Sequence, residues 1–298
     1  MSGNVRCAER MLGVLSWGAA LGVPVVLCVL MAFLLWRGLP GWSLGLFFGD
    51  TPPFAALLDG APVFDGLWPA CLGTLALVAL AAVIAIPVGV ASGVYLAEYA
   101  SGRSRQVFSF CVDLLAGIPS ILMGLFGFAL ILLLRKTVAP AANTGLLLSA
   151  LCLALLVLPY LISTTRLSME SLPQDLRLAG ACLGLTHAQT VRRILLPAAM
   201  HGIFGGIVLA IGRAAEDTAV ILLTGVVANA GAPSSLTGKY EALPFHIYYL
   251  AAEHQSPAQL TQAFAAALVL LCLTGGLFAA ARLLHGRLEQ KWKTGDAP

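Results

Sequence analysis

The chain has 298 residues, of which 59% are hydrophobic and only 10% are charged, and its mean hydropathy is +0.91. A soluble globular domain carries about 25% charged residues, so this composition excludes a water-soluble protein and indicates one embedded in a membrane. The net charge of +3 at pH 7 calls for no nucleic-acid partner. The seven cysteines contain no CxxC pair, which argues against a zinc site or a disulfide framework.

Long segments of the chain contain no Asp, Glu, Lys or Arg, namely 12–36, 66–97, 114–134 and 137–165. Each is long enough to cross about 30 Å of hydrocarbon, which takes about 20 apolar residues as a helix. The alternating short strands of a membrane β-barrel are absent from the sequence. We therefore expect an all-α membrane protein whose six transmembrane helices lie at 12–36, 68–96, 108–134, 145–162, 203–226 and 258–282.

The basic residues are distributed unevenly among the segments that connect these helices. If the N-terminus is cytoplasmic, the inside segments hold twelve of the 17 Lys and Arg residues, and Arg213 lies within a helix. The outside segments then hold the other four, which are Arg37, Arg135, Lys136 and Lys239. This asymmetry follows the positive-inside rule. It predicts that both termini face the cytoplasm. Since the sequence shows no soluble domain and no low-complexity tract, we also expect residues 1–298 to form a single membrane domain.

The cytoplasmic segment 163–202 is polar and carries signals for the start and end of helices. Residues 171–174 and 186–189 have the spacing of capping boxes, in which a Ser or Thr is followed three residues later by Gln. They predict a first short helix broken at Gly184 and a second one that ends at Pro197. The resulting helix–turn–helix carries an apolar stripe, which either the chain's own helix ends or a docked partner must cover.

The same segment resembles the EAA motif of bacterial ABC importer permeases, which forms the helices that dock on the ATPase subunit. Leu178-Ala179-Gly180 stands at the EAA position, and the later glycine and Ile-x-Leu-Pro follow at the motif's spacing. Leu178 replaces the motif's Glu, so Asp175 is the candidate for the salt bridge to the ATPase. Gly180 is expected to allow close approach of the partner's backbone. The resemblance implies a coupling loop with Asp175, Leu178, Ala179, Gly180, Gly184, Ile194, Leu196 and Pro197.

Three further segments resemble signatures of the PstA-type phosphate permeases within that family. They are AGIPSI with GLFG at 116–127, LPYLISTT at 158–165 and IGRAAEDTA at 211–219. The resemblance covers 67–226 and implies a type I ABC importer permease of the bacterial inner membrane with phosphate as its cargo. The first signature contains Gly117, Pro119, Ser120, Gly124 and Gly127, of which Gly117 and Pro119 also predict a kinked or broken helix.

Arg213, Glu216 and Asp217 place three charges inside the fifth predicted helix, where offsets of three and four residues share one face. Each charge at the bilayer centre costs about 2.5–3.5 kcal/mol on insertion scales, so we expect Arg213 to pair with Asp217. The pair either fixes a helix–helix contact or belongs to the substrate path, where a guanidinium matches phosphate oxygens. Glu216 is an addition to the family pattern. Arg166 is either part of the cytoplasmic exit of that path or an interfacial anchor.

No nucleotide site is visible in the sequence. The segment 231–239 ends like a P-loop but has Pro233 and Tyr240 where the motif needs Gly and Ser or Thr. We therefore expect this chain to bind no cofactor and ATP-Mg to bind a partner. The resemblance implies a second homologous permease, a cytoplasmic ATPase dimer and a periplasmic phosphate-binding protein. The alternatives are a permease for another oxyanion or solute, including the sister phosphate subunit, an ion channel, or a membrane-embedded enzyme.

Overall fold

A computed structural model describes the backbone of residues 2–58, 63 and 66–293. Residue 1 and residues 294–298, at which the sequence predicts cytoplasmic termini, lie outside the described residues. Within them all regular secondary structure is helical apart from one isolated bridge between Val226 and Tyr240, which confirms the all-α prediction. Six described helices have the length and composition to cross a membrane: Met11–Gly41, Trp68–Glu98, Ser120–Thr137, Leu146–Glu170, His187–Glu216 and Pro257–Leu283.

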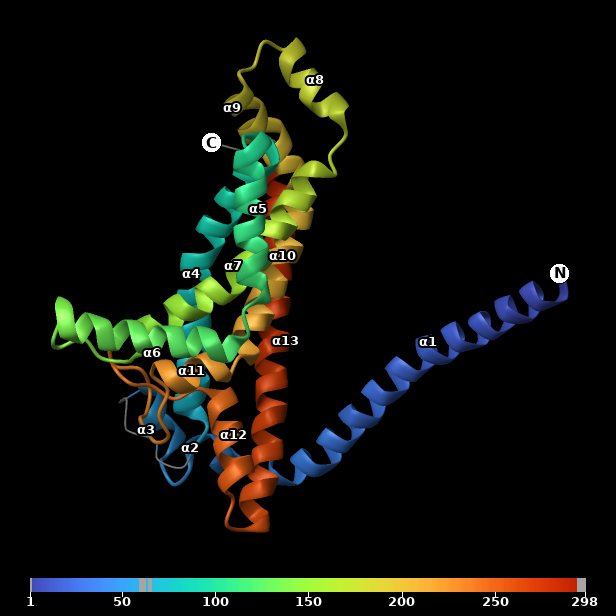
Figure 1. Cartoon of the computed structure of the whole chain (residues 1–298). Coiled ribbons are helices and arrows are strands. Elements are labelled where there is room, and N and C mark those ends of the chain that lie inside the picture. The colour runs from blue at the N-terminus through green and yellow to red at the C-terminus, as the bar shows by residue number, and fades with distance from the viewer. Residues whose placement is uncertain (1, 59–62, 64–65, 294–298) are drawn as a thin grey trace.

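Three long helices, α4 (Trp68–Glu98), α7 (Leu146–Glu170) and α10 (Leu196–Glu216), pack against one another at the centre of the molecule (Figure 1). In lipid, helices associate through close packing of small residues rather than through a hydrophobic driving force. Gly89 of α4 lies so near α7 that a Cβ there would be 2.6 Å from Cβ of Leu161. The shared core contains small and branched side chains, among them Ala81, Ala85, Val157, Leu161, Ala210 and Ala214.

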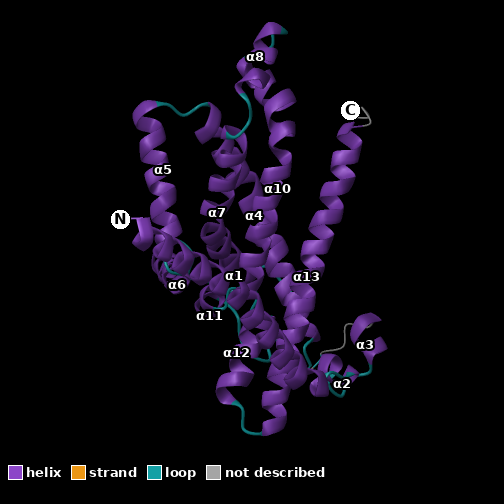
Figure 2. Ribbon diagram, turned by 90° about the vertical axis from the view of Figure 1, so that its right-hand side faces the viewer, coloured by secondary structure: helices purple, strands orange, loops and turns teal. Residues whose placement is uncertain are grey.

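The other helices surround this centre and define two ends of the molecule (Figures 1 and 2). We call the end that carries α8 and α9 the loop end, and the end that carries α2, α3 and α12 the opposite end. α13 packs along α10 and α12. The bounds are α1 Ser2–Gly38, α2 Leu44–Phe48, α3 Pro53–Leu58, α5 Gly102–Gly117, α6 Ser120–Thr137, α8 Gln174–Cys182, α9 His187–Thr190, α11 Ala219–Thr224, α12 Leu243–Glu253 and α13 Pro257–Lys293.

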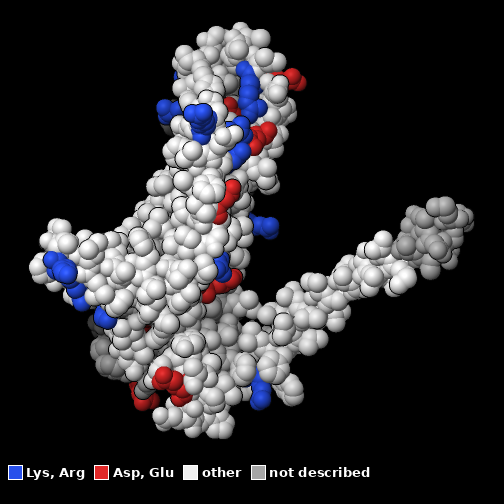
Figure 3. All heavy atoms as spheres, in the orientation of Figure 1, with Lys and Arg blue, Asp and Glu red and all other residues white. Residues whose placement is uncertain are grey.

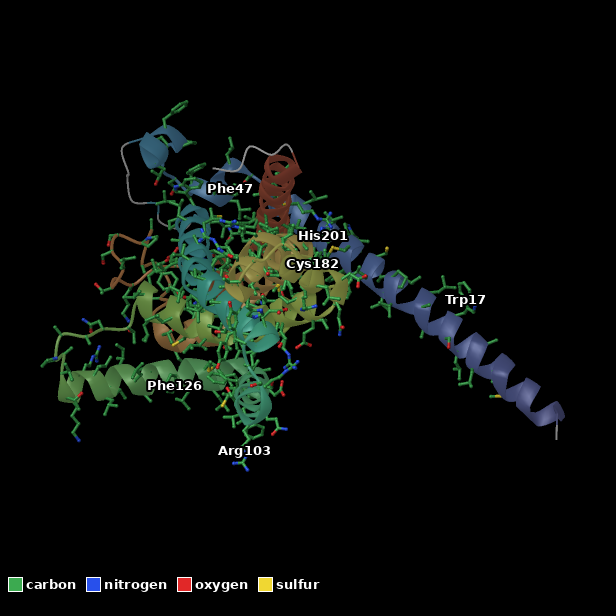
Figure 4. All side chains as sticks on the ribbon, turned by 90° about the horizontal axis from the view of Figure 1, so that it is seen from above. Trp17, Phe47, Arg103, Phe126, Cys182 and His201 are labelled. Atoms are coloured by element: carbon green, nitrogen blue, oxygen red, sulfur yellow. The ribbon has the colours of Figure 1, made fainter. Side chains whose placement is uncertain are left out.

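Helix α1 extends away from the rest of the protein, and Trp17 lies far from the helical body in the view from above (Figures 1 and 4). Only the last turns of α1 contact α13. There the rings of Phe33 and Phe264 pack edge to face, with their centroids 5.7 Å apart. None of the most apolar 18-residue window of this helix is buried within the protein. Such a bare apolar helix needs lipid or another protein chain around it.

The predicted third span at 108–134 is two helices, so a continuous span there is wrong. α5 ends at Gly117, Ile118 and Pro119 are extended, and α6 begins at Ser120. The Pro119 ring has no N–H and disfavours a helical conformation for Ile118, so the helix stops there. The interruption predicted from Gly117 and Pro119 is thus confirmed, and α6 runs across the central helices rather than along them (Figures 1 and 2).

The predicted fifth span at 203–226 is also interrupted. α10 ends at Glu216, Asp217 is extended with φ −73° and ψ 122°, and the short α11 follows. α11 packs beside α6 and α7. The two interrupted spans therefore lie against each other.

Pro197 does not end a helix, so the predicted stop at that residue is wrong. A π turn, Val191–Leu195, joins α9 to α10, and the N–H of Leu196 bonds to the carbonyl of Val191. A proline in a regular α-helix would clash with the carbonyl four residues earlier. The wider π turn ahead of Pro197 removes that conflict and lets the helix continue into the centre of the protein.

Candidate functional site

α8 and α9 form a helical hairpin at the tip of the loop end (Figure 1). The predicted capping box of the second helix is confirmed: Oγ1 of Thr186 accepts from the N–H of Gln189 at 3.3 Å, and the N–H of Thr186 donates to Oε1 of Gln189 at 2.9 Å. The predicted capping box of the first helix is wrong. Because α7 runs through to Glu170, Ser171 is its C-cap, and its hydroxyl donates back to the carbonyl of Ser168.

The apolar stripe of α8 is divided between an inner and an outer side. Leu176 packs toward a buried cluster that contains Met169 and Leu195. Leu178 is 62% exposed. Together with Leu178, three other exposed residues cover the outer side: Ala179, Cys182 and Leu183. We call these four residues the docking face, because the chain's own helix ends leave them uncovered.

Gly180 lies on the inner side of α8 and is buried. A Cβ there would lie 2.5 Å from Oγ1 and 2.6 Å from Cγ2 of Thr190 in α9. Gly180 therefore brings α8 onto α9 of the same chain, and the expectation that it serves a partner's backbone is wrong.

Gly184 turns the chain between α8 and α9 with a positive φ of 69°. Its N–H bonds to the carbonyl of Ala181 at 3.0 Å, and the N–H of Leu185 bonds to the carbonyl of Gly180 at 3.1 Å. These two bonds form a Schellman motif, which places a left-handed residue just after a helix. Gly184 is thus required for its backbone conformation.

Replacing Gly184 tests this conformation. A left-handed residue other than Gly costs about 1–2 kcal/mol, whereas Asn tolerates the conformation well. Since a Cβ at this position would meet nothing within 4 Å, Gly184→Val should open the hairpin and raise the rate of trypsin cleavage at Arg192 and Arg193 by about 5- to 30-fold. Gly184→Asn should stay near the unmodified protein. Equal cleavage rates in the two variants would contradict the backbone explanation.

An ion pair that the sequence did not predict lies beneath the hairpin. Arg177 of α8 donates to Glu98, the last residue of α4, at 2.7 Å. Since 79 residues separate the two partners along the chain, no short-range pattern in the sequence could have joined them.

The three charges at the end of α10 do not share one face. Arg213 and Glu216 are exposed on the helix, and the Arg213 side chain is 43% exposed. Asp217 is turned inward, and its side chain is 2% exposed. The predicted pair with Arg213 is present but long, at 3.8 Å between Nη2 and Oδ2. Asp217 Oδ1 instead accepts the N–H of Val220 at 2.8 Å, so this carboxylate caps α11.

Arg166 belongs to a separate cluster between α7 and α5. Its guanidinium donates to Glu170 and to the hydroxyl of Ser109, both at 2.8 Å, and Glu170 also binds Arg105. Because Gly206 of α10 lies against Thr164 of α7, Arg166 lies about nine residues, or about 14 Å, from the level of Arg213. Of the two interpretations of Arg166, this arrangement favours the interfacial anchor.

The glycines of the first signature position α6 against its neighbours. A Cβ at Gly124 would lie 2.9 Å from the carbonyl oxygen of Ala219 in α11, and one at Gly127 would collide with Sγ of Cys152 in α7. Gly117 has no such neighbour, and Ser120 is the first residue of α6. The signature therefore encodes the break between α5 and α6 and the close approach of α6 to α11.

A cavity of about 450 Å³ lies at the opposite end and is lined in part by Glu241 and Asn229. Burial raises the pKa of Glu241, while backbone hydrogen bonds from Asn229, Gly231 and Ala230 act in the other direction by stabilising its charged form. This carboxylate organises the segment that leads into α12.

A helical bundle with six candidate spans, two interrupted spans that pack together and an uncovered helical hairpin at one end defines a membrane transport permease. Residues 85–293 match the family described as "Binding-protein-dependent transport system inner membrane component". The chain belongs to this family. It is the permease subunit of an ABC importer, and it carries no catalytic or cofactor site of its own. The match extends the similarity beyond residue 226 through α12 and α13.

Two relatives share about one third of their aligned residues with this chain. The phosphate transport system permease protein PstA 1 of Mycobacterium tuberculosis (strain ATCC 25618 / H37Rv) is 35% identical over 226 residues, which are 74% of this chain and 70% of that protein. The PstA of Pasteurella multocida (strain Pm70) is 32% identical over 257 residues, 85% of this chain and 86% of that protein. An inward-facing structure of the MetNI methionine ABC transporter has 19% identity and a TM-score of 0.48, covering 78% of this chain and 99% of that one.

Proposed function

We propose that this permease carries inorganic phosphate across the bacterial inner membrane and that the whole chain forms one permease domain. The observation that carries the proposal is the 32% identity over 85% of the chain to a relative named as a phosphate permease. Arg213 supplies matching chemistry, since a planar guanidinium binds phosphate oxygens in pairs and is always charged. A permease for another oxyanion is the competing function.

The proposed substrate path runs along the exposed side of α10 at its junction with α11. Arg213 and Glu216 lie on this side, and Asp217 holds the start of α11 beside them. Discontinuous helices commonly line the path in transporters, because backbone that is not helical is tolerated where it borders a cavity. The packing of α11 on α6 brings the two interrupted spans of this chain to the same place.

The proposed partners follow from surfaces that this chain leaves uncovered. The docking face on α8 is where a cytoplasmic ATPase dimer binds, and Asp175, which is exposed in the first turn of α8, forms the salt bridge that Leu178 cannot. A second homologous permease covers α1 and completes the path beside Arg213. A periplasmic phosphate-binding protein docks at the opposite end.

The proposed orientation places the loop end in the cytoplasm, together with both termini. Figure 3 shows several Lys and Arg side chains, in blue, at the loop end. Two lie at the start of α5 and two in the π turn before α10: Arg103, Arg105, Arg192 and Arg193. Such an excess of basic residues marks the cytoplasmic side.

Labelling of single cysteines tests the orientation. In a variant without other cysteines, the exposed native Cys182 on α8 should react with an impermeant maleimide only after spheroplasts are permeabilised. A cysteine at the exposed Tyr248 of α12 should react in intact spheroplasts. Labelling of Cys182 from outside would reverse the orientation and remove the docking face from contact with a cytoplasmic ATPase.

Transport by the assembled complex tests the substrate. The permease pair, the ATPase and the binding protein are reconstituted in liposomes, and uptake of radiolabelled phosphate is measured with and without ATP. ATP-dependent uptake that excess phosphate competes away and excess sulfate does not is the expected result. Competition by sulfate or molybdate instead would assign another oxyanion, and uptake independent of ATP would indicate a channel.

A further inference from the structure

The docking helix α8 has little apolar attachment to the membrane-spanning part of the chain. Among its residues, Gly180 alone is fully buried, and it contacts Thr190 within the same hairpin. Leu176 is half-buried and is the side chain of α8 that packs toward the cluster at the ends of α7 and α10. A single half-buried leucine leaves the helix able to tilt. Beyond its packing on α9 and the π turn, a polar contact must therefore define where α8 sits relative to α4 and α7.

Arg177 makes that contact with all three of its guanidinium nitrogens. Nη2 donates to Glu98 Oε1 at 2.7 Å and to the carbonyl of Met169 at 3.1 Å, Nη1 donates to the carbonyl of Leu172 at 3.1 Å, and Nε faces Glu98 Oε2 at 3.5 Å. Glu98 is the last residue of α4, and Met169 belongs to the last turn of α7. One side chain of α8 thus binds the ends of α4 and α7.

The surroundings of Glu98 explain why it binds an arginine. A carboxylate at the C-terminal end of a helix opposes the helix dipole, so a cation beside it is stabilising. The Glu98 side chain is 4% exposed and that of Arg177 31% exposed, so solvent screens the pair little on the carboxylate side. The carbonyl of Glu98 also meets Nε2 of His187 at 3.1 Å, and the neighbouring Tyr99 ring packs on that imidazole.

We infer that Arg177 and Glu98 are positioning residues that make the docking helix move as one body with α4 and α7. The inference rests on the proposed function, in which an ATPase binds the docking face. A movement of α8 is then carried directly to α4, whose 31 residues extend for about 46 Å through the molecule. Without the pair, α8 would keep its packing on α9 and the π turn but lose its bonds to the ends of α4 and α7. Less of its movement would then reach those two helices, and less phosphate would be imported per ATP.

The test compares Arg177→Gln with Arg105→Gln in the reconstituted complex. Arg105 is a matched control, because it binds Glu170 between α5 and α7, and no hydrogen bond among the described residues joins it to α8. Arg177→Gln should still assemble and hydrolyse ATP, but the phosphate imported per ATP should fall at least about tenfold, as expected for the loss of a charge-assisted hydrogen bond. Arg105→Gln should keep the ratio of the unmodified complex. An unchanged ratio in assembled Arg177→Gln would overturn the inference.

A covalent tether separates positioning from folding. In a background without native cysteines, Glu98→Cys with Arg177→Cys is joined by a short bifunctional thiol reagent, which should restore the ratio that the untreated double variant lacks. A tethered complex that hydrolyses ATP without importing phosphate would also overturn the inference.

Spin labels on Ala181 of α8 and on the exposed Tyr95 of α4 give a second readout that needs no transport. Their distance distribution should broaden in Arg177→Gln and stay narrow in Arg105→Gln. A narrow distribution in both variants would contradict the positioning role. Failure of the unmodified complex to import phosphate would instead contradict the proposed function, while the label distances would still test the pair.

Discussion

Replacing Arg213 with glutamine is expected to lower phosphate uptake by about 10- to 100-fold while the complex still assembles. A charged donor gives a hydrogen bond worth about 1.5–3 kcal/mol, and a neutral amide gives much less, so the route loses its strongest attraction for an anion. Arg213→Lys is the matched variant, because it keeps the charge and removes the planar pair of donors. Its uptake should fall between those of the unmodified protein and Arg213→Gln.

The geometry of Asp217 decides how the double variant should behave. At 3.8 Å, the contact between Arg213 and Asp217 is too long for a hydrogen bond, and the carboxylate is engaged with the N–H of Val220. Asp217→Asn keeps an acceptor for that N–H and should therefore preserve α11, since Asn is as good a cap as Asp. If Arg213 only neutralised Asp217, removing both charges should recover transport.

Uptake and assembly are measured together for these variants in cells that lack other phosphate importers. We expect normal assembly and no recovery of uptake in the double variant Arg213→Gln, Asp217→Asn. Full uptake in that variant would show that the pair is structural and that the path does not use Arg213.

Replacing Leu178 with aspartate is expected to abolish binding of the ATPase while leaving the permease folded. Burying a leucine side chain contributes about 1.5–3 kcal/mol, and most of this gain is available because Leu178 is 62% exposed in the isolated chain. Although the family motif has Glu at this position, the exposed Leu178 of this chain requires an apolar contact on the partner. Aspartate would lose that contribution and bury a charge against it. Leu178→Ala should weaken the ATPase affinity by about 10- to 100-fold.

Copurification of the ATPase with the tagged permease measures this effect. Val138→Asp is the control, because Val138 is also strongly exposed, at 79%, but lies after α6, away from the docking face. Asp175→Asn should weaken binding more at low salt than at high salt, as expected for a screened ion pair. Undiminished copurification with Leu178→Asp would remove α8 from the interface with the ATPase.

The sequence alone was sufficient to predict the class of fold and the local helix break, turn and cap. Hydrophobic length predicts spans because a membrane tolerates backbone polar groups only when they bond within the segment. The break at Pro119, the turn at Gly184 and the capping box at Thr186 were likewise predicted, because each depends on residues within a few positions of one another. Motif spacing also located the helix that carries the docking face.

The tertiary structure alone decided which partners each charged or small residue has. Helical spacing placed Asp217 beside Arg213, but α10 stops at Glu216 and turns the carboxylate into the cap of α11. Gly180 packs against Thr190 of its own hairpin, and Arg177 binds Glu98, which lies 79 residues away along the chain. Local pattern describes one helix at a time, whereas these contacts depend on where separate helices end and meet. Packing between distant segments sets those meeting points.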